Sequence, residues 1–155
     1  MNKTDYLEKV AEFHAQFEAP VLDKPQIPSP KRCKLRVDLI QEELNELSKA
    51  IEDGDIIEIS DALCDLQYVL SGAVLEFGLK TKFAELFEEV HRSNMSKACS
   101  SIKEAEETIN HYKEKNNTKV EFKELNGKII VYRSDDNKVL KSINYSKADI
   151  KRILE

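Results

Sequence analysis

The sequence predicts an all-α fold: a four-to-five-helix bundle completed by dimerisation, with a small C-terminal β-hairpin plus a short helix. Long segments rich in Glu, Lys, Leu and Ala carry apolar residues at helical spacing. The 155 residues include only 4 Gly and 4 Pro, which disfavours a β-sandwich or a disordered chain. An Asn-Gly pair between β-branched and aromatic runs near the C-terminus predicts the hairpin.

The first two helices are expected on either side of a proline-rich connection. Residues 4–19 carry apolar side chains at helical spacing, and Thr4 is a suitable N-cap. The 4 prolines of the chain all lie in residues 20–30, which predicts an extended connection there. The second helix is expected over residues 31–52, where the apolar residues form a single stripe.

A short turn, Asp53-Gly54-Asp55, separates the second helix from a third one over residues 55–77. A turn of this length makes the third helix return antiparallel to the second. The third helix is apolar over much of its circumference, which predicts a place at the centre of a bundle or in a subunit interface. Cys64 lies in this apolar stretch and is expected to be a small core residue.

Two further helices are expected over residues 80–95 and 101–115, after Gly78 ends the third helix. Together these segments define a helical domain over residues 1–115.

The composition changes in the remaining residues, 116–155, which form an appendage. The segments 120–125 and 128–133 predict two strands joined at the Asn-Gly turn. Ser146 is expected to cap a last short helix over residues 147–154. A two-stranded hairpin is marginal alone, so it must pack on another part of the protein.

Charge and cysteine content exclude several classes of protein. A net charge of −5 disfavours nucleic acid as a general partner, because binding the phosphate backbone needs a basic surface. The 3 cysteines are widely spaced and form no CxxC motif, which suits a reducing compartment. The N-terminus lacks the apolar run of a signal peptide, and no segment reaches the length of a membrane span. We therefore expect a cytoplasmic protein with no membrane partner.

Two acidic clusters face each other across the short turn and form the candidate site. Residues three or four apart share a helix face, so each cluster projects in one direction. Because the helices are antiparallel, the two clusters are expected at similar heights. The first cluster contains Glu42, Glu43 and Glu46, and the second contains Glu58, Asp61 and Asp65.

The acids of the third helix interrupt a segment that is otherwise fit for burial. An unpaired buried carboxylate is costly, and no Lys or Arg lies between Lys49 and Lys80 to neutralise it. A hard divalent cation such as Mg²⁺ would neutralise several carboxylates at once. The alternative is a solvated acidic face on a non-catalytic helical protein that dimerises or binds partners.

Carboxylate clusters that bind metal ions commonly serve phosphoryl chemistry, which also needs cations for the distal phosphates. The segment 91–97 supplies Arg92, Asn94 and Lys97, of which the last two share a helix face. The alternative role of these cations is to satisfy the dipole of a helix C-terminus.

These residues resemble a known family. Glu43-x-x-Glu46 followed by Glu58-x-x-Asp61 resembles the ExxE…ExxD signature of the all-alpha NTP pyrophosphohydrolase superfamily, which includes MazG-like enzymes, dimeric dUTPases and phosphoribosyl-ATP pyrophosphohydrolase. The run from Asp61 to Gly72 is similar to a D-x-x-x-D-x-x-Y-V-x-x-G segment of one branch. Residues 90–97 are similar to the VHxSNMxK segment of that branch, and the N-terminal Phe-His…Pro-Val…Pro arrangement also fits.

The resemblance implies hydrolysis of a nucleoside triphosphate, a dNTP or a non-canonical NTP among them, to the monophosphate and pyrophosphate. It implies Mg²⁺, with Mn²⁺ as a substitute, held by four of the acidic residues, and a further acid, Asp65, as an additional or outer ligand. It implies a homodimer or a dimer of dimers with a role in cleaning the nucleotide pool. Phosphoribosyl-ATP is the alternative substrate. The four implied ligands are Glu43, Glu46, Glu58 and Asp61.

The resemblance also implies roles around the metal ions. Glu46 is the candidate general base, and Asn94 and Lys97 would bind phosphate oxygens. His14 and Tyr68 are candidates for the base or sugar pocket, with packing in the core as the alternative for both.

The resemblance ends near residue 97 and implies nothing for residues 98–155. Within this appendage, Lys138 and Lys141 are candidates for phosphate contacts in a partner's active site. Solubilising surface lysines are the alternative.

Overall fold

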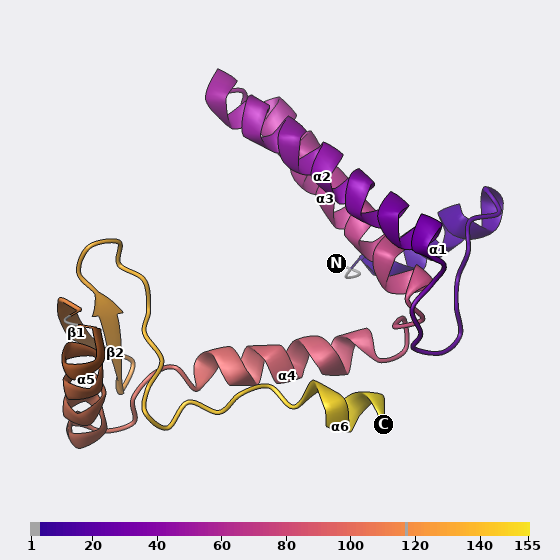
Figure 1. Cartoon of the computed structure of the whole chain (residues 1–155). Coiled ribbons are helices and arrows are strands. Elements are labelled where there is room, and N and C mark those ends of the chain that lie inside the picture. Colours follow the sequence, from indigo (N-terminus) through magenta and orange to yellow (C-terminus); the bar gives the residue numbers. More distant parts are fainter. Residues whose placement is uncertain (1–3, 117) are drawn as a thin grey trace. The chain divides into compact units, whose positions relative to one another are not determined.

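The computed structural model describes residues 4–116 and 118–155 and is mostly helical (Figure 1). The chain forms two compact units, residues 1–83 and 84–155. The expected division into a helical domain, residues 1–115, and an appendage, residues 116–155, stays a prediction.

The first unit is a helical hairpin with a third helix beside it. Its elements are α1 (Tyr6–Gln16), α2 (Pro30–Asp53) and α3 (Ile56–Glu76), of which α2 and α3 are antiparallel, as predicted. Gly54 ends α2 in the left-handed region, with φ 69°, and lets the chain reverse. The Asp55 carboxylate then caps α3 by accepting hydrogen bonds from the backbone N–H groups of Ile57 at 2.9 Å and Glu58 at 3.3 Å.

The connection between α1 and α2 runs along the C-terminal end of α3. The N–H of Leu22 donates to the Leu75 carbonyl, and the N–H of Gln26 donates to the Phe77 carbonyl, each at 3.1 Å. Gly78, with φ 68°, lies against this connection so closely that a Cβ would overlap the carbonyl of Lys24. The proline-rich segment is therefore ordered by backbone hydrogen bonds to the end of α3.

The second unit combines a helix, a helix-backed hairpin and a C-terminal tail. Its elements are α4 (Phe83–Met95), α5 (Ile102–Asn116), β1 (Val120–Leu125), β2 (Lys128–Arg133) and α6 (Ile150–Leu154). The two strands pair antiparallel, and one face of the hairpin packs on α5 around a small core. That core contains Cys99, Ala105, Ile129 and Val131. The hairpin thus meets the requirement for a packing partner within its own unit.

Several helix ends differ from the sequence predictions, and the first helix, expected to reach residue 19, ends at Gln16. The N-cap of the first helix is Asp5, not Thr4: its carboxylate accepts the N–H of Glu8 at 3.1 Å. The last helix is capped by Asp149, not Ser146, and begins three residues later than expected, at Ile150. In both cases a carboxylate near the predicted hydroxyl takes the capping role. The helix expected from residue 80 begins at Phe83.

The expectation that Cys64 is a core residue is wrong, because its side chain is exposed. Neighbouring apolar residues of α3 are exposed as well, including Leu63 at 52% and Leu70 at 45%. Within the first unit, α1 and α2 cover only part of the apolar circumference of α3. Over residues 4–116 and 118–155, no helix is long and apolar enough to span a membrane.

Candidate metal and nucleotide site

The α2–α3 hairpin brings three of the predicted acidic residues to one hollow of about 320 Å³. Glu46 comes from α2, and Glu58 and Asp61 come from the first turns of α3. The neighbouring Lys49, which forms an exposed ion pair with Asp53 at 2.9 Å, also lines this hollow. The antiparallel return after Gly54 therefore places the ends of both acidic clusters side by side.

Glu43 and Asp65, the other two predicted acids, interact from opposite helices. Partial burial raises the pKa of Glu43, and the negative charges of Asp65, Glu46 and other nearby acids raise it further. Like charges close to a partly buried carboxylate favour its neutral form. Negative charges from both helices thus act on Glu43.

These carboxylates fit a hard divalent cation by the chemistry of their donors, since Mg²⁺ prefers oxygen ligands. Over the part of the chain that the structure describes, no three Asp, Glu, His or Cys side chains stand in a group ready to hold a metal ion. The fit therefore rests on the carboxylate oxygens of Glu46, Glu58 and Asp61, which line one hollow.

A buried ion cluster lies on the same seam between α2 and α3, roughly two helical turns from Glu43. The carboxylate of Glu76, only 1% exposed, accepts hydrogen bonds from Arg36 and Arg32. Burial alone would raise the pKa of Glu76, but the hydrogen bonds from the two arginines outweigh it and hold the pKa below its ordinary value. Arg36 is itself 7% exposed, so this is an ion pair of the core and not of the surface.

Gly72 of α3 makes room for this cluster. A Cβ at this position would lie 2.6 Å from Nη1 of Arg36 and 3.2 Å from Nε2 of His14. Any larger residue would push the guanidinium out of its place between the two helices. The glycine at the end of the D-x-x-x-D-x-x-Y-V-x-x-G segment therefore has a packing role here.

His14 is buried, with 2% of its surface exposed, and belongs to this cluster. Its Nδ1 lies 2.8 Å from the carbonyl oxygen of Pro20, which can only accept, so Nδ1 carries the proton. Nε2 then faces Nη2 of Arg36 at 3.5 Å as an acceptor. Burial and the positive charge of Arg36 lower the pKa of His14, which keeps the ring neutral. His14 joins α1 and the proline-rich connection to α2.

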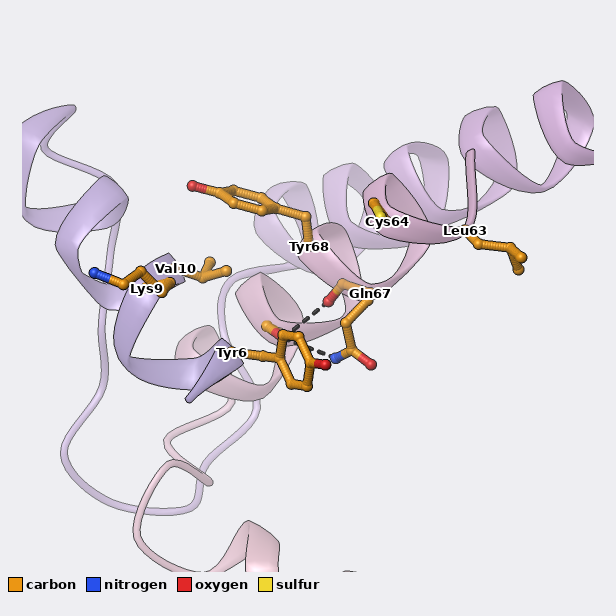
Figure 2. Close-up of a pocket in the computed structure, with 8 residues that line it drawn as sticks. Tyr6, Lys9, Val10, Leu63, Cys64, Gln67 and Tyr68 are labelled. Atoms are coloured by element: carbon orange, nitrogen blue, oxygen red, sulfur yellow. Dashed lines mark hydrogen bonds between the residues drawn. The ribbon is translucent and has the colours of Figure 1, made fainter. Parts of the chain in front are cut away.

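Tyr68 lines a second hollow of the first unit, of about 360 Å³, between α1 and α3 (Figure 2). Its ring meets that of Phe13 edge to face, with centroids 5.6 Å apart. Tyr6 and Gln67 line the same hollow, and the Gln67 amide donates to Ser71 at 3.0 Å (Figure 2). The walls are mostly apolar with a few polar groups, as in pockets for small organic ligands.

Asn94 and Lys97 belong to the second unit, at the end of α4. The ammonium of Lys97 donates to the side-chain oxygen of Asn94 at 2.7 Å, so the two residues share a face, as predicted. Arg92 points to a different set of partners: it pairs with Glu89 and donates to Ser146. Asn94 and Lys97 are thus bonded to each other, whereas Arg92 is bonded to other residues.

Sequence reasoning missed Lys49 in the metal-site hollow and the cluster of Arg32, Arg36 and Glu76. The available signal for Arg36 was its position: it lies seven residues before Glu43 and so falls on the same face of α2. The signal for Glu76 was a lone charge in an apolar stretch of α3.

Comparisons with known proteins identify the family of this chain. Residues 10–94 match the family model of phosphoribosyl-ATP pyrophosphohydrolase, which covers all five acidic residues and most of the chain up to the end of α4. An uncharacterized protein of Acanthamoeba polyphaga mimivirus is 25% identical, in an alignment that covers 98% of this chain and 96% of that protein. That relative therefore also aligns with the segment beyond residue 97. The chain belongs to the phosphoribosyl-ATP pyrophosphohydrolase family, within the all-alpha NTP pyrophosphohydrolase superfamily.

Proposed function

We propose that the protein hydrolyses a nucleoside triphosphate between the α and β phosphates, giving the monophosphate and pyrophosphate, with Mg²⁺ as cofactor and Mn²⁺ as a substitute. The observation that carries this proposal is that Glu46 of α2 and Glu58 and Asp61 of α3 line one hollow, inside the segment matched by the family model.

The metal ligands in this proposal are the five acids of the two clusters. Bound Mg²⁺ would neutralise phosphate oxygens and lower the pKa of a coordinated water. Glu46, exposed and on the wall of the hollow, accepts the proton of the attacking water as general base. The water oxygen bonds to the α-phosphorus, the bond from this phosphorus to the bridging oxygen breaks, and pyrophosphate leaves. The ligands are Glu43, Glu46, Glu58, Asp61 and Asp65.

Asn94 and Lys97 bind the phosphate oxygens in this proposal. The ammonium offers a charge-assisted hydrogen bond, and the amide NH₂ of Asn94 remains free to donate because its oxygen accepts from Lys97.

Tyr68 contacts the base or sugar in this proposal, since it borders a mostly apolar hollow beside α3. His14 acts one step further away. Its neutral ring is held by Pro20 and Arg36, and it fixes the position of α1 against α2.

A homodimer, or a dimer of dimers, completes the helical bundle in this proposal. Support comes from the apolar side chains that α2 and α3 leave exposed, among them Leu44 at 48%, Ile51 at 59% and Leu63 at 52%. Apolar surface of this extent on a small helical unit is typical of a protein interface.

Phosphoribosyl-ATP is a second candidate substrate, because the matched family model bears its name. Both candidates contain the same α–β phosphoanhydride, so the acidic residues would have the same roles. They differ in the group attached to the base, which is read by the nucleoside pocket and not by the carboxylates.

The experiment that separates these candidates compares kcat/KM for canonical dNTPs and NTPs, modified nucleotides and phosphoribosyl-ATP, with Mg²⁺ present. We expect pyrophosphate release from one or a few nucleoside triphosphates at least about tenfold faster than from phosphoribosyl-ATP, the difference that one good pocket contact provides. A preference for phosphoribosyl-ATP would establish the second candidate. No release from any compound by folded protein would favour a non-catalytic helical protein.

A further inference from the structure

The C-terminal tail, residues 140–149, is fastened to the end of α4 by backbone hydrogen bonds. The N–H of Ser142 donates to the carbonyl of Lys97 at 3.1 Å, and the N–H of Ser146 donates to the hydroxyl of Ser96 at 2.9 Å. The N–H of Asp149 donates to Glu89 at 2.8 Å. The tail thus returns along α4 within the second unit, next to the segment that carries Asn94 and Lys97 (Figure 1).

Further bonds fix the tail on its other side. The N–H of Lys141 donates to the hydroxyl of Tyr112 at 3.2 Å, and the N–H of Ile143 donates to the hydroxyl of Thr108 at 3.1 Å, both from α5. The backbone around Lys141 is therefore positioned by hydrogen bonds to α5 and to the end of α4. Its side chain remains exposed.

Tyr145 of the tail lies between α4 and the side chain of Lys141. Its hydroxyl lies 2.9 Å from the hydroxyl of Ser93 on α4, and the ammonium of Lys141 lies 4.3 Å from the centre of its ring. The hydrogen bond with Ser93 lowers the pKa of Tyr145, and the positive charges of Lys141, Lys97 and Lys147 lower it further. Lys147 is placed beside the same end of α4 by its backbone, because its carbonyl accepts a hydrogen bond from Arg92 at 3.2 Å.

Within residues 4–116 and 118–155, no Asp or Glu forms an ion pair with any of these three lysines. Two acids that contact the tail have other partners: Glu89 binds Arg92, and Glu104 accepts from Ser142 and from the N–H of Ser100. Gathering three like charges without a counter-ion is unfavourable, and a multivalent anion reverses this cost. In a chain with net charge −5, such a group is a local exception.

We propose that Lys97, Lys141 and Lys147 form a binding site for a linear polyphosphate anion, namely the β,γ-diphosphate of the substrate and the pyrophosphate product. We name this group the tail cation cluster. This inference rests on the proposed function, and it gives the tail a role in that reaction. The tail adds two ammonium groups, those of Lys141 and Lys147, to the single one of Lys97. A diphosphate is long enough to contact several ammonium groups at once, whereas orthophosphate contacts fewer. The cluster should therefore bind the diphosphate more tightly.

The first test measures binding of pyrophosphate to the full chain by calorimetry, without metal ions, and compares it with orthophosphate. The test variant is Lys141→Ala/Lys147→Ala. The control variant is Lys103→Ala/Lys113→Ala, which removes two exposed lysines of α5. We expect the test variant to bind pyrophosphate at least about tenfold more weakly, since two charge-assisted contacts are lost, and the control to bind within about twofold of wild type.

Three results of this measurement would contradict the tail cation cluster: no pyrophosphate binding by wild type, equal weakening by both double variants, or equal affinity for orthophosphate and pyrophosphate. The same variants in the hydrolysis assay separate this inference from the proposed function. A raised KM and a raised inhibition constant for pyrophosphate support the cluster. If the wild-type protein hydrolyses the substrate and the Lys141→Ala/Lys147→Ala variant keeps the wild-type KM and inhibition constant, the cluster is refuted and the proposed function stands. Absence of turnover in wild type, with pyrophosphate binding intact, would refute the function and leave the site.

Discussion

Glu46→Gln is expected to lower kcat for pyrophosphate release by about 10³-fold, with the helices intact. The substitution keeps the size and hydrogen-bonding shape of the side chain but removes the carboxylate that accepts the proton. Glu46 is exposed in its hollow, so the loss of charge does not disturb the core. Steady-state kinetics at saturating Mg²⁺ and substrate measures the effect, and far-UV circular dichroism checks the fold.

The matched control is Glu52→Gln, which makes the same chemical change on the same helix, at an exposed residue away from the acidic hollow. We expect its kcat to stay within about twofold of wild type, since exposed substitutions away from a site have small effects. A Glu46→Gln variant with near-wild-type turnover would remove Glu46 from the catalytic machinery.

Glu76→Gln is expected to lower the free energy of unfolding by about 3–5 kcal/mol, because it leaves the buried Arg36 without a counter-charge. The size of the side chain is unchanged, so the effect reports charge and not a cavity. Urea denaturation at pH 7, followed by circular dichroism, gives the difference. Asp38→Asn is the control. It breaks the exposed pair with Lys34 within α2 and should lower the free energy of unfolding by less than about 1 kcal/mol.

The pH dependence of this difference provides a second check. The folded-state pKa of Glu76 lies below its ordinary value of 4.5. The ionised carboxylate therefore stabilises the fold fully above that value, and its contribution is lost as the pH falls through the lowered folded-state pKa. The gap between wild type and Glu76→Gln should shrink from pH 4.5 downward. A gap that is constant across this range would assign the effect to packing.

The antiparallel hairpins were predictable from sequence because local signals determine them. In the β-hairpin, Asn126 and Gly127 have φ 52° and 69°, the left-handed values that a two-residue turn demands. In the helical hairpin, Gly54 has φ 69° and Asp55 caps the next helix. Periodicity on both sides of such turns fixes which faces meet, so the encounter of the two acidic clusters followed from spacing alone.

The buried ion cluster was not predictable by the same means, because its partners lie far apart in the chain. Arg36 and Glu76 are separated by 40 residues, and each looks like an ordinary charged residue within its own helix. Only the register of α2 against α3 shows that Arg36 points inward and that Gly72 leaves space for it. His14 fell on an apolar stripe, which indicated burial but not its bonds to Pro20 and Arg36.

The error at Cys64 has a different origin. An apolar stretch indicates that a helix becomes covered, but it does not say by which chain. Within the first unit, α1 and α2 leave the face with Leu63 and Cys64 exposed. The tail posed a third kind of problem: its lysines are spaced irregularly, and only hydrogen bonds to α4 and α5 bring Lys141 beside Tyr145.

The most direct test of metal-dependent α–β hydrolysis is the fate of the water oxygen. Wild-type protein is incubated with its preferred nucleoside triphosphate in water labelled with the heavy oxygen isotope, once with Mg²⁺ and once with EDTA. Mass spectrometry then shows which product carries the heavy oxygen. Attack at the α-phosphorus predicts Mg²⁺-dependent release of pyrophosphate, with the heavy oxygen in the monophosphate and none in the pyrophosphate. Heavy oxygen in the pyrophosphate, or release that persists in EDTA, would contradict the proposed reaction.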